Sequence, residues 1–372
     1  MKPRSFKILL INWQDITNPF SGGAEVHLHE IFKRVVAAGH DVTLLCCGYK
    51  GAPAEEVIDG IKVVRRGNRS LFNFFVPLAY RRLRRKNQFD IVIDDINKIP
   101  FFTPLFVREP VLAIEHHFFG KSIYLQAPFL SAGYVYYSEK LVPLVYRKTP
   151  FAAVSQSTRS ELREMGVRSQ IDLLQNAVDI ERYQVLADEK STTPLIGYLG
   201  RLKKYKSVEH VLRALLLVKK RFSETELLII GDGDYRRELE RRAEALGLRD
   251  RVKFTGYVSH EDKVKLLNRV WLIVNPSPKE GWGLTVIEAN ACAVPVVAAD
   301  SPGLRDSVVD GKTGVLYPYG DVEVLAKEMI QLLENETKRN QLALQARKWA
   351  EKFNWDESAR KAMKIIRRIT SS

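Results

Sequence analysis

Short apolar runs alternate with longer amphipathic stretches along the chain, a pattern typical of parallel strands joined by helices. In the first half, continuous apolar runs predict strands, and helix-type spacing predicts helices that stop at a glycine. The predicted strands are residues 6–12, 41–47, 61–65, 90–94, 111–115 and 151–155, and the predicted helices are residues 24–39 and 157–165.

A second series of the same kind begins near residue 194. Its predicted strands are 194–198, 226–231, 252–255, 272–275 and 294–298, and its predicted helices are 208–221, 235–246, 263–270 and 284–292. The polar stretch between the two series has no apolar period, so we place a hinge there. The predicted fold class is α/β, with two doubly wound domains whose ligands bind at the carboxyl ends of the strands. The predicted domains are 1–185 and 186–355, followed by an amphipathic helix, 356–372, that could pack back on the first domain.

The bulk properties agree with two folded domains and favour an anionic partner. A chain of 372 residues exceeds what one core usually supports. The net charge of +14 favours nucleic acid, an acidic membrane surface or a phosphorylated ligand, without choosing among them. Three cysteines make no disulfide framework, which indicates the cytoplasm. No segment approaches the ~18 uninterrupted apolar residues of a spanning helix.

The sharpest motif is the segment 275–289, Asn-Pro-Ser-Pro-Lys-Glu-Gly-Trp-Gly-Leu-Thr-Val-Ile-Glu-Ala. A predicted strand leads into a loop rich in Pro and Gly, and a predicted helix follows. Gly281 and Gly283 leave amides uncovered where a helix N-terminus carries partial positive charge, which is typical of an anion site. Glu280 and Glu288 flank this point and suit a ligand with a central phosphate and hydroxyls at both ends. An exposed glutamate and a capping glutamate are the alternative.

This segment resembles the glycosyltransferases of family 4. Glu280 and Glu288, separated by seven residues, match the E-x7-E element of that family, and segments 289–297 and 310–314 are similar to its downstream blocks. The resemblance implies a GT-B fold, in which two Rossmann-like domains face each other across a cleft. It implies that Glu280 contacts the donor sugar and that Glu288 holds the ribose hydroxyls. The amides that we expect at the diphosphate are those of Gly283, Leu284 and Thr285.

A cationic loop follows the strand predicted at 194–198. A departing diphosphate gains negative charge, which fixed cations stabilise without a metal. The family has an Arg and a Lys at the spacing of Arg201 and Lys206, so we expect these side chains to be catalytic, although solvated surface charges are the alternative. The chain departs from the family at Ser207, at Ala293 and in the turn 301–303, where glycine is usual.

Two features of the first domain match the family less specifically. Gly22 and Gly23 form a turn that lets the backbone approach phosphate closely, although a plain tight turn is equally compatible. At the end of the strand predicted at 111–115, His116 falls best on the family's single histidine near the sugar and the acceptor, with His117 as the second choice. Because no other His or Cys stands at ligand spacing, we expect no metal here.

Two further groups complete the predicted site. Asp95 and Asn97 end the preceding strand and could orient the acceptor hydroxyl, or could be satisfied loop side chains. Asp232, in a Gly-Asp-Gly-Asp turn, suggests the metal site of the GT-A fold, but its place in the second domain favours the nucleotide turn of family 4. Val258 stands where family members hold the base with backbone groups. We expect no metal and no cofactor beside the donor substrate.

The stretch 62–86 carries nine cations and no acid, interleaved with the aromatic segment 71–80. Such a segment is typical of contact with an anionic membrane surface. The alternative is that its aromatic side chains pack inside the first domain. A membrane contact would agree with a lipid-linked acceptor and a location at the inner face of the membrane.

The resemblance implies retaining, metal-independent transfer of a hexose from a UDP- or GDP-sugar to an acceptor hydroxyl of a glycan or a lipid-linked sugar. A GT-B nucleotide-sugar epimerase or a glycosyl phosphorylase is the alternative within the same fold. A basic nucleic-acid-binding protein is the alternative outside it, but the sequence contains no recognition helix and no stacking platform, so we expect no nucleic acid as partner.

Overall fold

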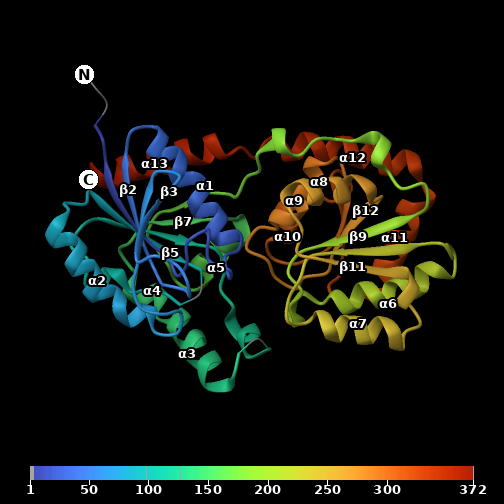
Figure 1. Cartoon of the computed structure of the whole chain (residues 1–372), viewed down its shortest axis with the longest axis horizontal. Coiled ribbons are helices and arrows are strands. Elements are labelled where there is room, and N and C mark those ends of the chain that lie inside the picture. Colours follow the sequence, from blue (N-terminus) through green and yellow to red (C-terminus); the bar gives the residue numbers. More distant parts are fainter. Residues whose placement is uncertain (1–3, 98, 126, 372) are drawn as a thin grey trace. The chain divides into compact units, whose positions relative to one another are not determined.

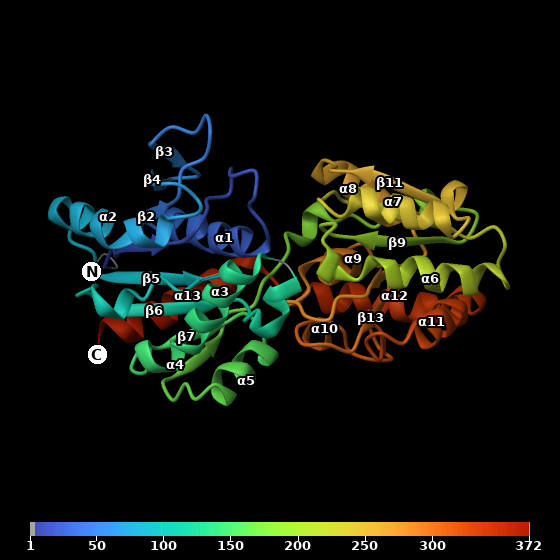
Figure 2. The ribbon, with the colours of Figure 1, turned by 90° about the horizontal axis from the view of Figure 1, so that it is seen from below.

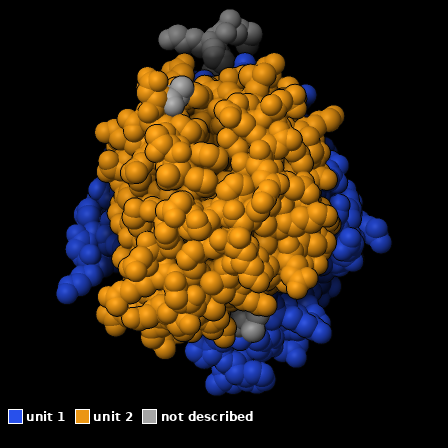
Figure 3. All heavy atoms as spheres, turned by 90° about the vertical axis from the view of Figure 1, so that its right-hand side faces the viewer, with its two compact units in different colours: residues 1–176, 355–372 blue, residues 177–354 orange. Residues whose placement is uncertain are grey.

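The computed structural model describes residues 4–97, 99–125 and 127–371 and divides the chain into two compact units (Figure 1, Figure 3). Unit 1 comprises residues 1–176 and 355–372, and unit 2 comprises residues 177–354. Each unit is an α/β domain with a largely parallel sheet, which confirms the predicted fold class.

In the described part of unit 1, eight strands form one sheet in the order β3-β4-β2-β1-β5-β6-β7-β8. Figure 2 labels β3, β4, β2, β5, β6 and β7 in this sequence. All neighbouring pairs are parallel except β3 and β4. The strands are β1 (Lys7–Ile11), β2 (Asp41–Cys46), β3 (Glu55–Ile58), β4 (Ile61–Arg65), β5 (Ile91–Ile96), β6 (Val111–Glu115), β7 (Phe151–Ala153) and β8 (Ile171–Leu173). The helices are α1 (Gly23–Ala37), α2 (Phe72–Lys86), α3 (Phe129–Lys140), α4 (Val142–Val145), α5 (Gln156–Glu164) and α13 (Trp355–Thr370).

The strand order of unit 1 reverses between β1 and β5. Both strands are buried almost throughout, as expected for strands covered by helices on both faces. Because the chain leaves β1 and β5 in opposite directions, the topology predicts a ligand-binding crevice between their following loops, at the carboxyl edge of the sheet. This edge receives the loop before α1 and the residues after β5.

Unit 2 repeats this arrangement with six strands, in the order β11-β10-β9-β12-β13-β14 among its described residues. Its strands are β9 (Leu195–Leu199), β10 (Glu226–Ile230), β11 (Val252–Gly256), β12 (Leu272–Asn275), β13 (Val296–Ala299) and β14 (Gly314–Tyr317). Its helices are α6 (Val208–Lys219), α7 (Arg236–Ala245), α8 (His260–Arg269), α9 (Leu284–Ala291), α10 (Leu304–Ser307), α11 (Val322–Glu334) and α12 (Glu336–Ala350). Figure 1 shows α6 and α7 on one side of the sheet and α8, α9 and α12 on the other. The order reverses between β9 and β12, so the topology predicts a ligand-binding crevice between the loops after these two strands, the crevice of unit 2.

The unit boundary differs from the hinge expected after residue 185. The structure places it after residue 176, because the aperiodic stretch that follows is bonded to unit 2. Asn268 of α8 accepts a hydrogen bond from the Leu186 amide at 2.7 Å and donates one to the Gln184 carbonyl at 2.9 Å. The last helix, α13, returns to unit 1, where it packs against α1 and Asp356 pairs with Arg34 at 2.6 Å.

Candidate active site

The two loops that flank the crevice of unit 2 bring Lys206 and Glu280 together. The Nζ atom of Lys206 lies 2.5 Å from Oε1 of Glu280, and the two side chains are only 14% and 17% exposed. Burial alone would lower the pKa of Lys206, but the Glu280 carboxylate outweighs it, so the pKa is raised and the amine stays charged. The structure therefore holds a fixed cation with limited solvent contact beside Glu280, in the loop for which the sequence predicts diphosphate binding.

The loop that carries Glu280 is held by the turn before α10. The amide of Glu280 donates to the Pro302 carbonyl at 3.0 Å. Gly303, which has a φ of +82°, lies so close that a Cβ atom there would be 2.1 Å from the Glu280 carbonyl oxygen. The turn at 301–303 therefore packs directly against the backbone of Glu280 and holds it in place.

Glu288 lies in α9 and is held by two side chains that belong to none of the sequence motifs. The Tyr183 hydroxyl donates to Oε1 of Glu288 at 2.6 Å, and Nζ of Lys263 lies 2.5 Å from the same atom. Burial, followed by the Glu288 charge, raises the pKa of Tyr183, so its hydroxyl stays a donor. Tyr183 lies in the aperiodic stretch before β9, where no local pattern marks it.

Helix α9 begins at the crevice of unit 2. Gly283 is its N-cap with a φ of +85°, and a Cβ atom there would lie 2.5 Å from Oγ of Ser307. The amides of the first helical residues, Leu284 and Thr285, have no partner within the helix by geometry. The predicted anion site is thus a helix start whose cap position favours glycine.

The other predicted donor-side residues follow neighbouring strands at the same edge of the sheet. Arg201 follows β9, and its carbonyl accepts from the Tyr198 hydroxyl at 3.1 Å. Asp232 follows β10, accepts from the Gly233 amide at 2.8 Å and lies 3.7 Å from Arg236. Val258 follows β11 and is half-buried. No group of three or more His, Cys, Asp or Glu that could hold a metal ion occurs among the described residues.

In unit 1, the structure distinguishes the two neighbouring histidines. His116 is buried and its Nε2 atom lies 2.8 Å from Oδ1 of the buried Asp95. The ring of His117 instead packs edge-on against Phe119, at 4.7 Å between centroids. His116 is therefore the histidine whose ring is oriented by a carboxylate at the end of β5.

Asn97 is tied to the start of α1 through Glu25. Its Nδ2 atom donates to Oε1 of Glu25 at 3.0 Å and to Oδ1 of Asn12 at 2.9 Å. The other oxygen of Glu25 accepts from the Gly22 amide at 2.6 Å, while a Cβ atom on Gly23 would meet open space. The predicted acceptor-side Asn97 and the predicted phosphate-side Gly22 thus belong to one hydrogen-bonded group.

Two sequence families match the chain. Glycosyltransferase Family 4 matches residues 21–182, and Glycosyl transferases group 1 matches residues 179–349. The chain belongs to the family-4-type glycosyltransferases.

Relatives along the whole length agree with this assignment. The glycogen synthase of Mycobacterium tuberculosis is 25% identical, over 95% of this chain and 92% of its own length. Sucrose-phosphate synthase from Thermosynechococcus elongatus has the same fold, with a TM-score of 0.86 and 20% identity over 99% of this chain and 100% of that chain. HepE of Anabaena, in complex with UDP-glucose, gives a TM-score of 0.79 and 20% identity over 98% of this chain and 100% of the HepE chain. The fold of this glycosyltransferase is GT-B.

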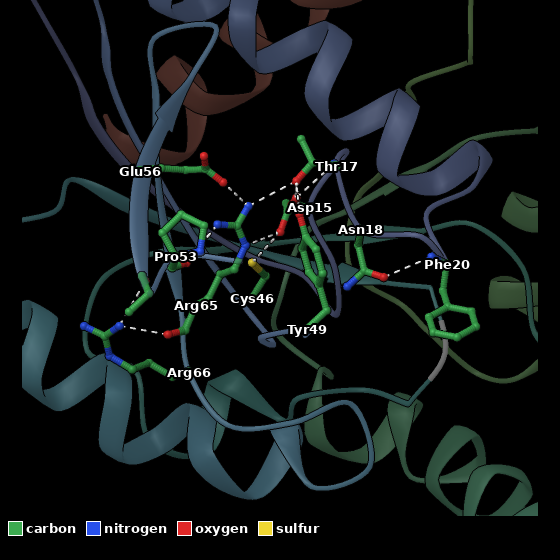
Figure 4. Close-up of polar contacts among 11 residues, drawn as sticks. Asp15, Thr17, Asn18, Phe20, Cys46, Tyr49, Pro53, Glu56, Arg65 and Arg66 are labelled. Carbon is green, nitrogen blue, oxygen red and sulfur yellow. Dashed lines mark hydrogen bonds and ion pairs between the residues drawn. The ribbon is translucent and has the colours of Figure 1, made fainter. Parts of the chain in front are cut away.

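The loop before α1 of this glycosyltransferase is anchored by a buried ion pair (Figure 4). Nε of Arg65, at the end of β4, lies 2.8 Å from Oδ2 of Asp15, and both side chains are 1% exposed. Asp15 also accepts from the amide of Thr17 at 2.9 Å, and the Thr17 hydroxyl lies 2.8 Å from that of Tyr49. Burial would raise the pKa of Asp15, but the donors Arg65 and Thr17 hold it below its usual value. The network fixes the segment that leads to Gly22.

Replacing Gly303 tests the role of the turn beneath Glu280. We expect Gly303→Ala to lower kcat/KM at least about tenfold, because the new Cβ displaces the Glu280 backbone and small misplacements at a reacting centre are costly. Gly320→Ala is the matched control, since its φ of +88° imposes similar backbone strain but its Cβ would meet open space. Equal activity losses in the two variants, measured by steady-state kinetics, would contradict this role.

His27 predicts how stability depends on pH. Burial, followed by the charge of His116, lowers the pKa of His27 to about 3 from an ordinary 6.5. Between these values the unfolded chain binds a proton that the folded chain does not, so stability falls as pH falls through this window. From pH 7 to pH 5 we expect His27 to remove about 2 kcal/mol. Urea unfolding at both pH values should show a smaller loss in His27→Gln than in the parent; identical losses would refute the assignment.

Proposed function

We propose that this glycosyltransferase transfers a hexose from a UDP- or GDP-sugar to an acceptor hydroxyl, with retention at the anomeric carbon and without a metal. The observation that carries the proposal is the Lys206–Glu280 pair on the two loops that flank the crevice of unit 2. The likeness to HepE, whose complex contains UDP-glucose, supports a nucleotide-sugar donor.

Each half of the donor has a proposed partner in unit 2. Glu280 contacts the hexose, and Glu288, oriented by Tyr183 and Lys263, binds the ribose hydroxyls. Lys206 and Arg201 stabilise the diphosphate together with the amides at the start of α9. Asp232 and Val258 lie on the nucleotide side.

The proposed reaction is a front-face displacement. The bond between the anomeric carbon and the diphosphate oxygen breaks as the acceptor oxygen bonds to the same face, and a phosphate oxygen takes the acceptor proton. Lys206 and Arg201 stabilise the charge that develops on the leaving diphosphate. In unit 1, Asp95 holds the His116 ring in a fixed orientation, and His116 is proposed to act near the sugar and the acceptor. Asn97 and His117 are proposed to lie on the acceptor side.

The acceptor is proposed to be a glycan or a lipid-linked sugar at the inner face of a membrane. The exposed cations of the stretch 62–86, which exclude the buried Arg65, support this, since lipid-linked acceptors lie at a charged surface. No helix among the described residues is long and apolar enough to cross a bilayer.

A donor screen in the presence of EDTA tests the proposal. UDP, GDP and their hexose derivatives are added to the protein, and the unfolding temperature is measured. We expect one nucleotide class to raise it, and Glu288→Gln to reduce that effect, whereas Glu244→Gln on an exposed surface keeps it. If no nucleotide sugar stabilises the protein, or if turnover requires a metal, the proposal fails. An inverted anomer in the product would refute retention, and a product formed without an acceptor would indicate an epimerase.

A further inference from the structure

Exposed apolar side chains are concentrated on one part of unit 1. Among the described residues, twelve of the eighteen exposed large apolar side chains lie between residues 71 and 144, mainly on α2, α3 and α4. Soluble surfaces normally scatter such side chains singly, and a contiguous group marks an interaction site. Figure 1 shows these three helices on unit 1.

Helix α2 divides the aromatic segment between the core and the surface. Its buried face, which includes Phe72 and Tyr80, belongs to the core beside β1 and β2. The exposed positions of α2 recur at helical spacing and therefore form one outer face. The first half of this face is apolar and the second half is basic. These outer positions are Leu71, Phe74, Phe75, Leu78, Arg82 and Arg85. The packing of aromatic side chains inside the domain is therefore observed for one face of the helix, and the other face is exposed.

Helix α3 adds a second exposed face beside the first. Leu130, Tyr134, Tyr137 and Leu141 recur every three or four residues and are 86%, 43%, 65% and 46% exposed. The two helices touch through Tyr134, whose hydroxyl accepts from Nδ2 of Asn73 at 2.5 Å and whose ring stacks on Phe74 at 6.5 Å between centroids. The two faces therefore form one surface.

The charges around this surface are almost all positive. Between residues 129 and 148 the one acid is Glu139, which is buried and accepts from the amides of Phe119 and Gly120. On α2, Arg84 is paired with Glu109, at 2.8 Å. The remaining exposed cations are Arg81, Arg82, Arg85, Lys86, Lys121, Lys140, Arg147 and Lys148.

We infer that the outer faces of α2 and α3–α4 together form a docking surface for an anionic phospholipid bilayer. Exposed Phe, Tyr and Leu side chains enter the headgroup region, while Arg and Lys side chains contact lipid phosphates. A second copy of the same face is disfavoured because the two sets of cations would repel. Nucleic acid is also disfavoured as the occupant. The leucine side chains that protrude from both helices can insert between acyl chains but contribute little to stacking on bases. This extends the surface proposed for 62–86 to a second helix and does not depend on the donor chemistry.

Vesicle flotation with the whole protein tests the inference. The probes are vesicles of phosphatidylcholine alone and with about one-third phosphatidylglycerol. We expect binding to the anionic vesicles only, weakened roughly tenfold or more by Arg82→Gln/Arg85→Gln and by Phe74→Ser/Leu130→Ser. The matched controls are Arg249→Gln and Leu344→Ser, exposed positions of unit 2 that should bind like the parent.

The outcomes separate this surface from the proposed catalysis. Stabilisation by nucleotide sugar, measured without vesicles, should be the same in the parent and in all four variants. No binding to anionic vesicles would overturn the inference, as would binding that the apolar variant leaves unchanged, because simple polyanion attraction would then explain it. Stronger binding to single-stranded nucleic acid than to vesicles would also overturn it. A failed donor screen would leave the vesicle result intact.

Discussion

Replacing Lys206 with Met should lower kcat by roughly two to three orders of magnitude. The ammonium lies against Glu280 at 2.5 Å with little solvent contact, so water cannot replace the charge that the departing diphosphate requires. Because that charge appears mainly in the transition state, kcat should fall more than KM rises. Steady-state kinetics with the nucleotide sugar that stabilises the protein measures both, and Lys206→Arg should recover part of kcat.

Lys203 provides a matched control in the same loop. It also pairs with a carboxylate, Asp234 at 2.6 Å, but the two side chains are 40% and 69% exposed. Lys203→Met removes the same charge from the same segment and should leave kcat within about threefold, since exposed pairs contribute little. If both substitutions reduce kcat equally, the effect is general electrostatics, and Lys206 has no specific place at the leaving group.

The features of this glycosyltransferase that can be predicted from the sequence are those that depend on short continuous segments. Buried strands and glycine-ended helices appear as apolar periods, and the loops after β9 and β12 carry Lys206 and Glu280 in recognisable motifs. The hydrogen bond between Glu25 and the cap of α1 could also have been predicted, because an acid three residues after a helix cap is a local sequence signal.

The unpredictable part is pairing across distant segments. Tyr183 and Lys263 meet at Glu288 from an irregular stretch and from α8, and no spacing links the three. The pairing of Lys206 with Glu280 likewise depends on the order of strands, which places β9 beside β12. The sequence presents Arg65 as one cation of a basic stretch, but its side chain is buried in an ion pair.

Replacing Arg65 with Met should destabilise the protein by roughly 3–5 kcal/mol. The substitution leaves the buried Asp15 without its main cation, and it also removes donors to the Pro53 carbonyl and the Thr17 hydroxyl, at 3.0 and 3.2 Å. A charge left buried and unpaired costs more than the pair itself contributes. Urea unfolding of the parent and the variant at neutral pH measures the difference.

A control substitution at Arg66 and a double substitution test whether the loss of stability comes from the unpaired buried charge of Asp15. Arg66 pairs with Glu55, with side chains 35% and 63% exposed, so Arg66→Met should cost less than about 1 kcal/mol. Asp15→Leu/Arg65→Met should recover part of the stability, since it removes both fully buried charges and leaves only the partly exposed Glu56 without its cation. The kinetics of that double variant then test whether activity requires the ion pair that anchors the loop before α1. If the pair serves to hold the segment before Gly22, the variant should stay folded yet lose activity. A double variant with full activity would mean that the pair contributes only to stability.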